Sequence, residues 1–375
     1  MNKPIFYATE KDIFDILASL KKRITKSILF DLCINRGILL SYEEERDDII
    51  NYISMLPHDY IDLSALLAIA RTNTRSERKT SMEVNTEIQS KDINTVIDAI
   101  KKDREKYGET YRVISESNNR STIKVEYTVV DYGMTRLRQR VEKEGYIEVM
   151  KENGRTKIRR PANDKMQEIT SGILTELKKV TRKELEEEAI SLVHIRDPEI
   201  RILFFVSLIK NLSGFELVDV THVRVSRLKD TDTREIDTDA SDASEEIEQT
   251  EEVLIGHVSR AALDGIGLLN SEEYQNLKEK GFFISSLVWK SQEKAGRSGN
   301  QVVFEASFDN SEDFTNFVYN VKGYYKHTEE GFTITKLPFN ELEKSSYHKL
   351  IEDAAKKALL ECNKKYNEIS RKAKK

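Results

Sequence analysis

The fold is decided by one stretch, VEYTVVDYGMTRLRQRVEKEGYIEVMKENGRTKIRRP (Val125 to Pro161), which returns in altered form as VFEASFDNSEDFTNFVYNVKGYYKHTEEGFTITKLP (Val303 to Pro338). Each reads as a strand that ends in Asp, a short amphipathic helix, a Gly-Tyr step, a strand, a glycine turn and a last strand before proline. The turn glycine stands seven residues before the proline in both stretches. Such self-similarity predicts two copies of one domain.

The correspondence continues upstream of these stretches. The segment Leu17 to Leu32 is similar to Leu174 to Ala189, and Ile49 to Leu56 corresponds to Ile202 to Ile209. One acidic insertion in the second copy, residues 229–252, reconciles the spacing of the two regions.

We therefore predict an α+β protein made by tandem duplication of one domain, with helices, a short, mainly antiparallel sheet and a helix-hairpin unit in each copy. The predicted boundaries are residues 1–165 for the first copy, 166–338 for the second copy and 339–375 for a long C-terminal helix. The last segment carries one apolar stripe at helical spacing. Its members are Leu342, Leu350, Ile351, Ala354, Ala358 and Leu359.

Glycines mark where several elements are expected to end. The helices predicted at Asp92 to Gly108 and at Ser271 to Gly281 each stop at a glycine, which adopts the left-handed backbone that ends many helices. Asn153 followed by Gly154 favours a tight hairpin turn.

The insert at residues 229–252 holds eleven Asp or Glu against Lys229 and Arg234, a net charge of −9. Because it lacks the period of a buried face, it is predicted to be a disordered loop. The whole chain carries −5, so the remainder carries +4. The modest overall acidity therefore does not exclude a surface that binds a polyanion.

Composition limits the class of protein. The chain has 375 residues, of which 33% are charged and 38% hydrophobic, and no run of about 18 apolar residues that could span a membrane. The N-terminus lacks the apolar core of a signal peptide, so a cytoplasmic location without membrane contact is expected. Cys33 and Cys362 are too isolated for a metal knuckle and are expected to be small buried apolar residues.

The two copies differ in charge over the same scaffold. Residues 131–161 hold nine Lys or Arg and five Asp or Glu, whereas residues 309–338 hold three Lys and five Asp or Glu. In the first copy, Arg136, Arg140 and Lys143 follow a helical spacing, and a hairpin after them adds further cations. The candidate nucleic-acid-binding residues are Arg136, Arg140, Lys143, Arg155, Lys157, Arg159 and Arg160.

A basic short helix followed by a basic hairpin resembles the recognition helix and wing of winged-helix modules. That resemblance implies a helix that approaches a groove and a hairpin that contacts phosphates. The segment departs from the pattern in one respect, because a strand precedes the helix. A secondary basic loop, with Arg71, Arg75, Arg78 and Lys79, is a second candidate contact with a phosphate backbone, or a plain linker.

The sequence contains none of the common catalytic signatures. The chain has no Gly-x4-Gly-Lys-Ser/Thr phosphate loop, no complete dinucleotide fingerprint, no Gly-x-Ser-x-Gly elbow and no pair of histidines at metal-binding spacing. Asp131 and Asp309 end the same strand in each copy and are interpreted as helix caps. We expect no cofactor and no metal, and we favour a protein without catalytic activity.

Three functions stay open. The first is a nucleic-acid-binding protein, with DNA favoured over RNA as its target, which would act as a sensor or regulatory subunit in bacterial antiviral defence. The second is a scaffold subunit of a larger assembly, with a protein partner or self-association through the second copy and the C-terminal helix. The third is a metal-dependent nuclease whose carboxylates converge only in the fold. The charge difference favours the first.

Overall fold

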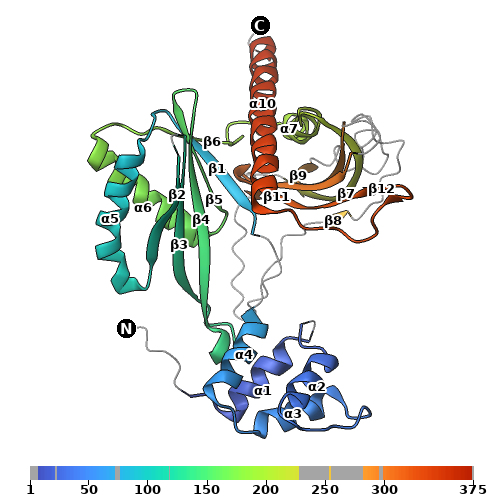
Figure 1. The fold of residues 1–375 in the computed structure, drawn as a ribbon. Helices are drawn as coiled ribbons and strands as arrows, with labels where there is room; N and C mark the ends of the chain where they lie inside the picture. Colours follow the sequence, from blue (N-terminus) through green and yellow to red (C-terminus); the bar gives the residue numbers. More distant parts are fainter. Residues whose placement is uncertain are drawn as a thin grey trace, which may run out of the picture. The chain divides into compact units, whose positions relative to one another are not determined.

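The computed structural model describes residues 7–21, 23–71, 77–117, 119–227, 253–254, 282–294 and 299–373 (Figure 1). The chain is a mixed α+β protein with a large antiparallel sheet and a long C-terminal helix. It divides into two compact units that each draw on separate parts of the sequence. The first unit is Met1–Ser76, Ile88–Glu148 and Ile169–Lys183, and the second is Glu77–Glu87, Val149–Glu168 and Glu184–Lys375.

The first unit begins with four helices around a small apolar core, namely α1 (Glu10–Ser19), α2 (Lys26–Ile34), α3 (Arg46–Met55) and α4 (Tyr60–Arg71). Thr9 starts α1 through a capping box: its hydroxyl accepts the Asp12 backbone N–H, and the Asp12 carboxylate accepts the Thr9 backbone N–H at 2.9 Å. Ile13, Ile16 and Leu17 then turn one face of α1 into the core.

A short 3₁₀ turn, η2 (Arg136–Arg138), joins these helices to the sheet of the same unit. Leu137 is buried in the core of the four helices. Arg136 donates from Nη1 to the Asp12 carboxylate at 2.6 Å, so the residue that caps α1 also holds this turn. One apolar side chain and one ion pair therefore fix this turn.

The sheet of the first unit is ordered β2 (Thr110–Glu116), β3 (Arg120–Val130) and β4 (Arg140–Glu152). Ser121, Ile123, Val125 and Tyr127 alternate with less buried residues along β3, as expected for a strand with one covered face. Figure 1 shows the two helices of this part, α5 (Ser90–Arg104) and α6 (Asp164–Thr181), beside these strands. A second 3₁₀ turn, η1 (Glu105–Tyr107), follows α5.

The second unit contains a curved sheet ordered β5 (Arg155–Pro161), β1 (Lys79–Val84), β11 (Thr315–Tyr325), β10 (Gln301–Asn310), β9 (Phe282–Glu293), β7 (Phe215–Arg227) and β8 (Val253–Leu254). The short β6 (Glu187–Ala189) also pairs with β1. A separate small hairpin joins β12 (His327–Thr328) to β13 (Gly331–Phe332). Two helices, α7 (Pro198–Lys210) and α10 (Glu341–Ala373), pack against each other and against this sheet (Figure 1).

Aromatic side chains dominate the core of the second unit. Phe308 and Phe314 stack with ring centroids 4.2 Å apart, and Phe204 meets Phe308 edge to face at 5.1 Å. The buried Arg201 lies over the rings of both Phe283 and Phe314 and donates to the backbone carbonyls of Ile195 and Glu312. Burial lowers the pKa of Arg201 to about 10, yet its carbonyl partners satisfy the charged group.

Several sequence predictions are confirmed. The C-terminal segment forms α10, and Ile351, Ala354 and Ala358 of its stripe are buried. Asn153 and Gly154 both have positive φ, at 51° and 79°, in the tight turn between β4 and β5. Gly108 ends η1 in the left-handed region at φ 74°. Cys33 and Cys362 are free and buried, and burial raises the pKa of both thiols. None of the described helices combines the length and apolar character needed to cross a membrane.

The helix predicted after Asp131 is wrong. Residues 136–138 form a single 3₁₀ turn, and β4 begins at Arg140. The reason is a competing period of two: Gly145, Ile147 and Val149 are buried and alternate with more exposed residues, which allows β4 to pair with β3. The stretch after Asp309 is likewise a turn followed by β11. Without a recognition helix, the resemblance to a winged-helix module is not supported.

The tandem duplication is not shown by the structure. The segment Ile49 to Leu56 lies mainly in α3, and Ile202 to Ile209 lies in α7, so those two match. However, Leu17 to Leu32 contains the end of α1 and α2, whereas Leu174 to Ala189 contains the end of α6 and β6. The helix predicted at Ser271 to Gly281 and the acidic insert at 229–252 lie outside the described residues. The duplication and its domain boundaries therefore stay predictions.

Candidate functional site

Three of the four cations of β5 are buried in the second unit instead of facing solvent. Lys157, Arg159 and Arg160 are 5%, 1% and 7% exposed, although all three were predicted to contact phosphates. A guanidinium or ammonium group that is buried to this extent requires an opposite charge or several acceptors beside it. The opposite charge comes from α10, where Glu352 stands 193 positions after Arg159 in the chain.

Glu352 of α10 is the centre of this arrangement. Arg159 donates from Nε to Glu352 Oε1 at 2.5 Å and from Nη2 to Oε2 at 3.0 Å, which is the two-pronged geometry of the strongest Arg–carboxylate pairs. Tyr319 of β11 donates its hydroxyl to the same carboxylate. Lys157 approaches Glu352 Oε2 at 3.4 Å. We call Lys157, Arg159, Tyr319 and Glu352 the buried charge cluster.

Further carboxylates complete the surroundings of Lys157. Burial alone lowers the pKa of a lysine, but Glu352, Glu152 and Asp353 together outweigh burial and raise the pKa of Lys157 above its usual value. The distances from Nζ are 3.4 Å to Glu152 and 3.5 Å to Asp353. Lys157 therefore stays charged inside the protein and holds α10 against the β4–β5 hairpin.

The other predicted hairpin residues are also engaged. Arg160 donates from Nη1 to the Pro161 carbonyl at 3.2 Å, and burial lowers its pKa. Arg155 is more exposed and pairs with Glu188 at 2.7 Å, with Glu83 at 3.8 Å. The local excess of positive charge at the hairpin is thus neutralised by acidic residues from α10, β1 and β6.

The three residues that were predicted to share a helix face are separated. Arg136 pairs with Asp12 and lies over the ring of Tyr7, 4.6 Å from its centroid. Arg140 and Lys143 lie on β4, where an odd spacing places side chains on opposite faces of a strand. Both interact with other groups of the chain. Arg136, Arg140 and Lys143 therefore do not form one continuous basic surface.

The secondary basic loop is only partly described. Arg71 is the last residue of α4, Lys79 begins β1, and Arg75 lies outside the described residues. Arg78 donates to Asp309 at 2.7 Å and to Ser307 at 3.2 Å. Asp309 is thus an ion-pair partner, and no helix follows it. Asp131 instead accepts the backbone N–H of Gly133, within the turn that leads to η2.

His348 lies one helical turn before Glu352 and is 3% exposed. Its ring meets Tyr319 edge to face at 5.7 Å, and its Nε2 has no hydrogen-bond partner among the described residues. Burial is the main reason that the pKa of His348 falls to about 2, and the nearby charges of Arg159, Lys79 and Lys344 lower it further. The imidazole is therefore neutral in the folded protein.

An exposed apolar surface on the four helices was missed by the sequence analysis. Arg36, just after α2, donates to the Pro57 carbonyl at 2.7 Å and to the Asp62 carboxylate, which brings the ends of α2 and α3 to the start of α4. Large apolar side chains that lie close to this junction in the sequence face solvent. They are Ile34, Tyr52, Met55, Tyr60 and Ile61, which we call the apolar patch.

A sequence signal for this patch was present. In α3, Ile49, Ile50 and Ile53 form the buried face, so Tyr52 and Met55 fall on the other face at a spacing of three. Met55 is 70% exposed and Ile61 is 75% exposed. Exposed apolar groups that gather in one place indicate an interaction surface, whereas single ones do not.

Within the part of the chain that the structure describes, no group of three or more His, Cys, Asp or Glu side chains is placed so that it could hold a metal ion. Comparison with models of known protein families finds no match for the chain, and comparison with curated proteins finds none either.

The pKa of His348 leads to a testable dependence of stability on pH. The folded pKa of about 2 lies below the usual 6.5, so below pH 6.5 the unfolded chain binds a proton that the folded chain does not. The contribution of the neutral His348 to the free energy of unfolding is fully present above pH 6.5. It falls by roughly 1.4 kcal/mol for each pH unit below 6.5. We expect the free energy of unfolding of His348→Phe, measured in urea between pH 7.5 and 5, to lack this fall with decreasing pH.

The exposed His222 provides the matched control, since His222→Phe should unfold with the same pH dependence as the natural chain. Parallel curves for the natural chain and His348→Phe would mean that His348 takes up its proton in the folded state, contrary to its burial.

Proposed function

We propose that this chain is a non-catalytic interaction subunit that binds a protein partner through the apolar patch. The observation that carries the proposal is the exposure of Ile34, Met55 and Ile61 at the junction that Arg36 holds together. A surface of this kind is costly in water unless another apolar surface covers it. The junction is also well ordered by its own hydrogen bonds, so a partner would meet a prepared surface.

The surroundings of the patch indicate the chemistry of the partner. Residues 27–70 contain eight Asp or Glu and only two cations, Arg36 and Arg46, a net charge of −6. Arg36 pairs with Asp62, while Arg46 donates to the carbonyls of Leu17 and Ile24. Asp31, Asp48 and Asp59 remain exposed around the patch. An apolar face with an acidic rim is complementary to an amphipathic helix with a basic polar face.

The C-terminal helix offers less for association in the described residues. Its exposed large apolar side chains are Leu360 and Ile369. They stand nine positions apart, which is half a turn out of phase at 100° per residue, so they do not form one stripe. No continuous exposed apolar stripe on the described part of α10 supports self-association through this helix. Self-association through α10 and binding of a partner by the second copy therefore stay predictions.

The patch can be tested with designed peptides. Two fluorescent amphipathic peptides of about 18 residues, five helical turns, share a Leu stripe and differ in a Lys-rich or a Glu-rich polar face. We expect the Lys-rich peptide to bind in fluorescence anisotropy. Replacing both Met55 and Ile61 by Ser should weaken binding at least about 100-fold, because each buried apolar side chain contributes roughly 1.5–3 kcal/mol.

Leu39→Ser removes an apolar side chain that is even more exposed than Met55 and Ile61 but is not one of the patch residues, and this variant should bind as the natural chain does. Asp48→Asn with Asp59→Asn should weaken binding of the Lys-rich peptide and make it less sensitive to salt. Equal binding of both peptides, or equal loss in the Leu39 and the Met55–Ile61 variants, would contradict the proposal.

Nucleic-acid binding is the second candidate, and one observation favours it. The turn between β3 and β4 exposes the ring of Tyr132, and Arg136 and Arg140, which follow it in the chain, are exposed as well, although Arg136 pairs with Asp12. Aromatic rings that stack on bases, next to cations that contact phosphates, are typical of single-strand binding surfaces. Other cations of this hypothesis, Lys157 and Arg159, are held by Glu352 and would not take part.

Anisotropy with labelled single-stranded and double-stranded DNA and RNA tests this candidate. We expect binding that falls steeply between low and moderate salt, and a loss of roughly tenfold in the Tyr132→Ala, Arg140→Ala variant. Lys102→Ala, an exposed cation on α5, is the control. Absence of binding to every probe by folded protein excludes this candidate and leaves the apolar patch unaffected.

A further inference from the structure

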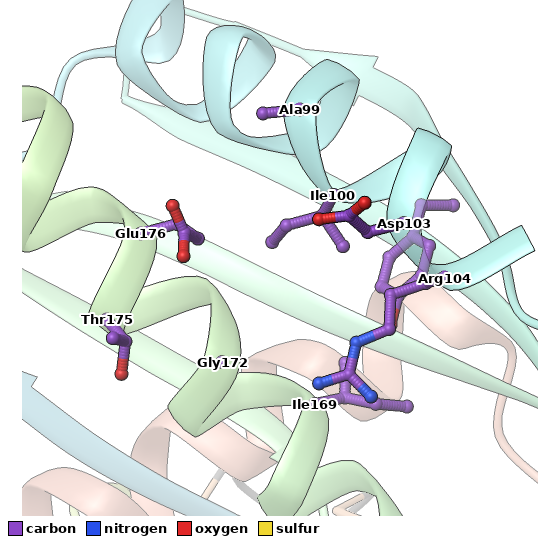
Figure 2. A pocket seen from close by; sticks show the side chains of 9 residues that line it. Ala99, Ile100, Asp103, Arg104, Ile169, Gly172, Thr175 and Glu176 are labelled. Atoms are coloured by element: carbon purple, nitrogen blue, oxygen red, sulfur yellow. The ribbon is translucent and has the colours of Figure 1, made fainter. Parts of the chain in front are cut away.

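Charged side chains that are engaged within the chain offer little to a ligand, and the cavity of about 350 Å³ between α5 and α6 is such a case. Figure 2 shows Asp103, Arg104 and Glu176 at its opening. Arg104 interacts with other groups of the chain, and Glu176 pairs with Lys179 at 2.7 Å. A partner that is recognised by charge requires groups that the fold leaves unpaired, and α10 carries several of these.

Five cations on the C-terminal half of α10, which we call the α10 cations, lack a partner. They are Lys357, Lys364, Lys365, Arg371 and Lys372. Within the residues that the structure describes, none of their side chains takes part in an ion pair or a hydrogen bond. Two other lysines of the same helix differ in this respect. Lys356 pairs with Glu83 at 2.6 Å, and Lys349 pairs with Glu152.

The α10 cations follow two lines along the helix. Lys357, Lys364 and Arg371 are spaced by seven residues, which is almost two full turns, so they lie within about 40° of one another around the axis. At 1.5 Å per residue this line is about 21 Å long. Lys365 and Lys372 form a second line beside it. Figure 1 shows this end of α10 extending beyond the strands of the second unit, where a long partner can approach it.

The helix terminus accounts for only part of this charge. Cations in the last turn interact favourably with the partial negative charge at the C-terminal end of a helix, which explains Arg371 and Lys372. That interaction falls off within one turn, so it does not explain Lys357 or Lys364.

Acidic residues in the same part of α10 leave a positive excess. Glu361 is engaged, because it accepts hydrogen bonds from Ser207 at 2.5 Å and from Asn211 at 3.0 Å. Glu368 lies between the two lines of cations and has no ion pair in the described part of the chain. Residues 357–372 hold five Lys or Arg and these two carboxylates, a net charge of +3. The surface is therefore complementary to a polyanion.

We propose that the α10 cations bind the phosphate backbone of a double-stranded nucleic acid. A duplex carries one negative charge for about every 1.7 Å of its axis, so the longer line runs beside roughly a dozen phosphates. A protein partner fits less well, since lysine is depleted at the centre of protein interfaces, and the exposed apolar Leu360 and Ile369 form no stripe. A membrane surface would require an exposed apolar helix face, whereas Ile351 and Ala358 are buried in the core.

The same surface favours a duplex over a single strand. Proteins that bind single strands stack bases on exposed aromatic rings. The aromatic ring in this part of α10 belongs to Tyr366, which instead packs edge to face on His194, with the ring centroids 5.8 Å apart. The turn that carries Tyr132 and Arg140 belongs to the first unit and has the single-strand chemistry, so the two surfaces can be tested separately.

Fluorescence anisotropy of the full chain with a labelled duplex of about 25 base pairs tests the proposal, over roughly 50 to 250 mM KCl. Five phosphate contacts should make the logarithm of the association constant fall against the logarithm of salt concentration with a slope of about −4.5. Replacing Lys357, Lys364 and Arg371 by Gln should bring the slope to about −1.8 and weaken binding at least about 100-fold near 0.1 M salt. Glutamine has nearly the helix propensity of lysine, so the unfolding midpoint should stay unchanged.

Two further variants use the same helix. Lys349→Gln with Lys356→Gln is the matched control, because it removes two lysines that are already paired with carboxylates. It should keep the slope and should change the affinity less than about threefold. Glu368→Gln removes a negative charge from between the two lines of cations and should bind the duplex more tightly.

Absence of duplex binding by the folded protein would overturn the proposal, as would equal losses in the paired-lysine and the unpaired-cation variants. Tighter binding of a single strand or of polyglutamate than of the duplex would also contradict it, because another polyanion would then be the ligand. The Tyr132→Ala, Arg140→Ala variant should bind the duplex as the natural chain does. The peptide titrations of the apolar patch are independent of all these results.

Discussion

The ion pair between Arg159 and Glu352 is the constraint on which the second unit depends. Both side chains are almost completely buried, and they share two hydrogen bonds. A buried charge without its partner is strongly destabilising, so β5 and α10 each require the other in place. Tyr319 of β11 also donates to Glu352, so β11 depends on the same carboxylate. Lys157 pairs with Glu152 as well, which connects the end of β4 to this arrangement. One carboxylate on the last helix therefore joins three segments that are distant in sequence.

This constraint changes how the charge of the chain is interpreted. The positive excess of residues 131–161 looks like a surface for a polyanion when it is counted along the sequence. In the fold, Lys157 and Arg159 are neutralised inside the protein, and Arg155 is paired at its edge. The side chains that still lack a complement and carry the proposed function lie in the first unit: the apolar patch with its acidic rim. The patch belongs to binding chemistry and needs no reaction centre.

Local signals predict the structure correctly where one residue type determines the backbone. Asn153 and Gly154 specify a hairpin turn, Gly108 ends a helix, and the stripe through Ile351, Ala354 and Ala358 specifies α10. The prediction of a short helix after Asp131 is wrong, because the helical spacing of three cations competes there with the alternation of Gly145, Ile147 and Val149 in the strand that follows. Buried apolar residues decide secondary structure more strongly than exposed charges do.

The candidate sites could not be predicted in the same way, since each is a meeting of distant segments. Nothing near Arg159 indicates that its partner is Glu352, 193 positions later. The apolar patch was partly accessible, because the outer face of α3 can be read from the sequence, but its contact with α4 depends on the hydrogen bonds of Arg36.

A double-mutant cycle on Arg159 and Glu352 tests the central claim most directly. The free energy of unfolding would be measured in urea for the natural chain, Arg159→Met, Glu352→Met and the double variant. Each single variant should lose about 3–5 kcal/mol, because each leaves a buried charge alone, and the double variant should lose at least about 2 kcal/mol less than the sum. Single losses below about 1 kcal/mol that add without coupling, as for exposed ion pairs, would contradict the account and would return Arg159 to the cations available for a ligand.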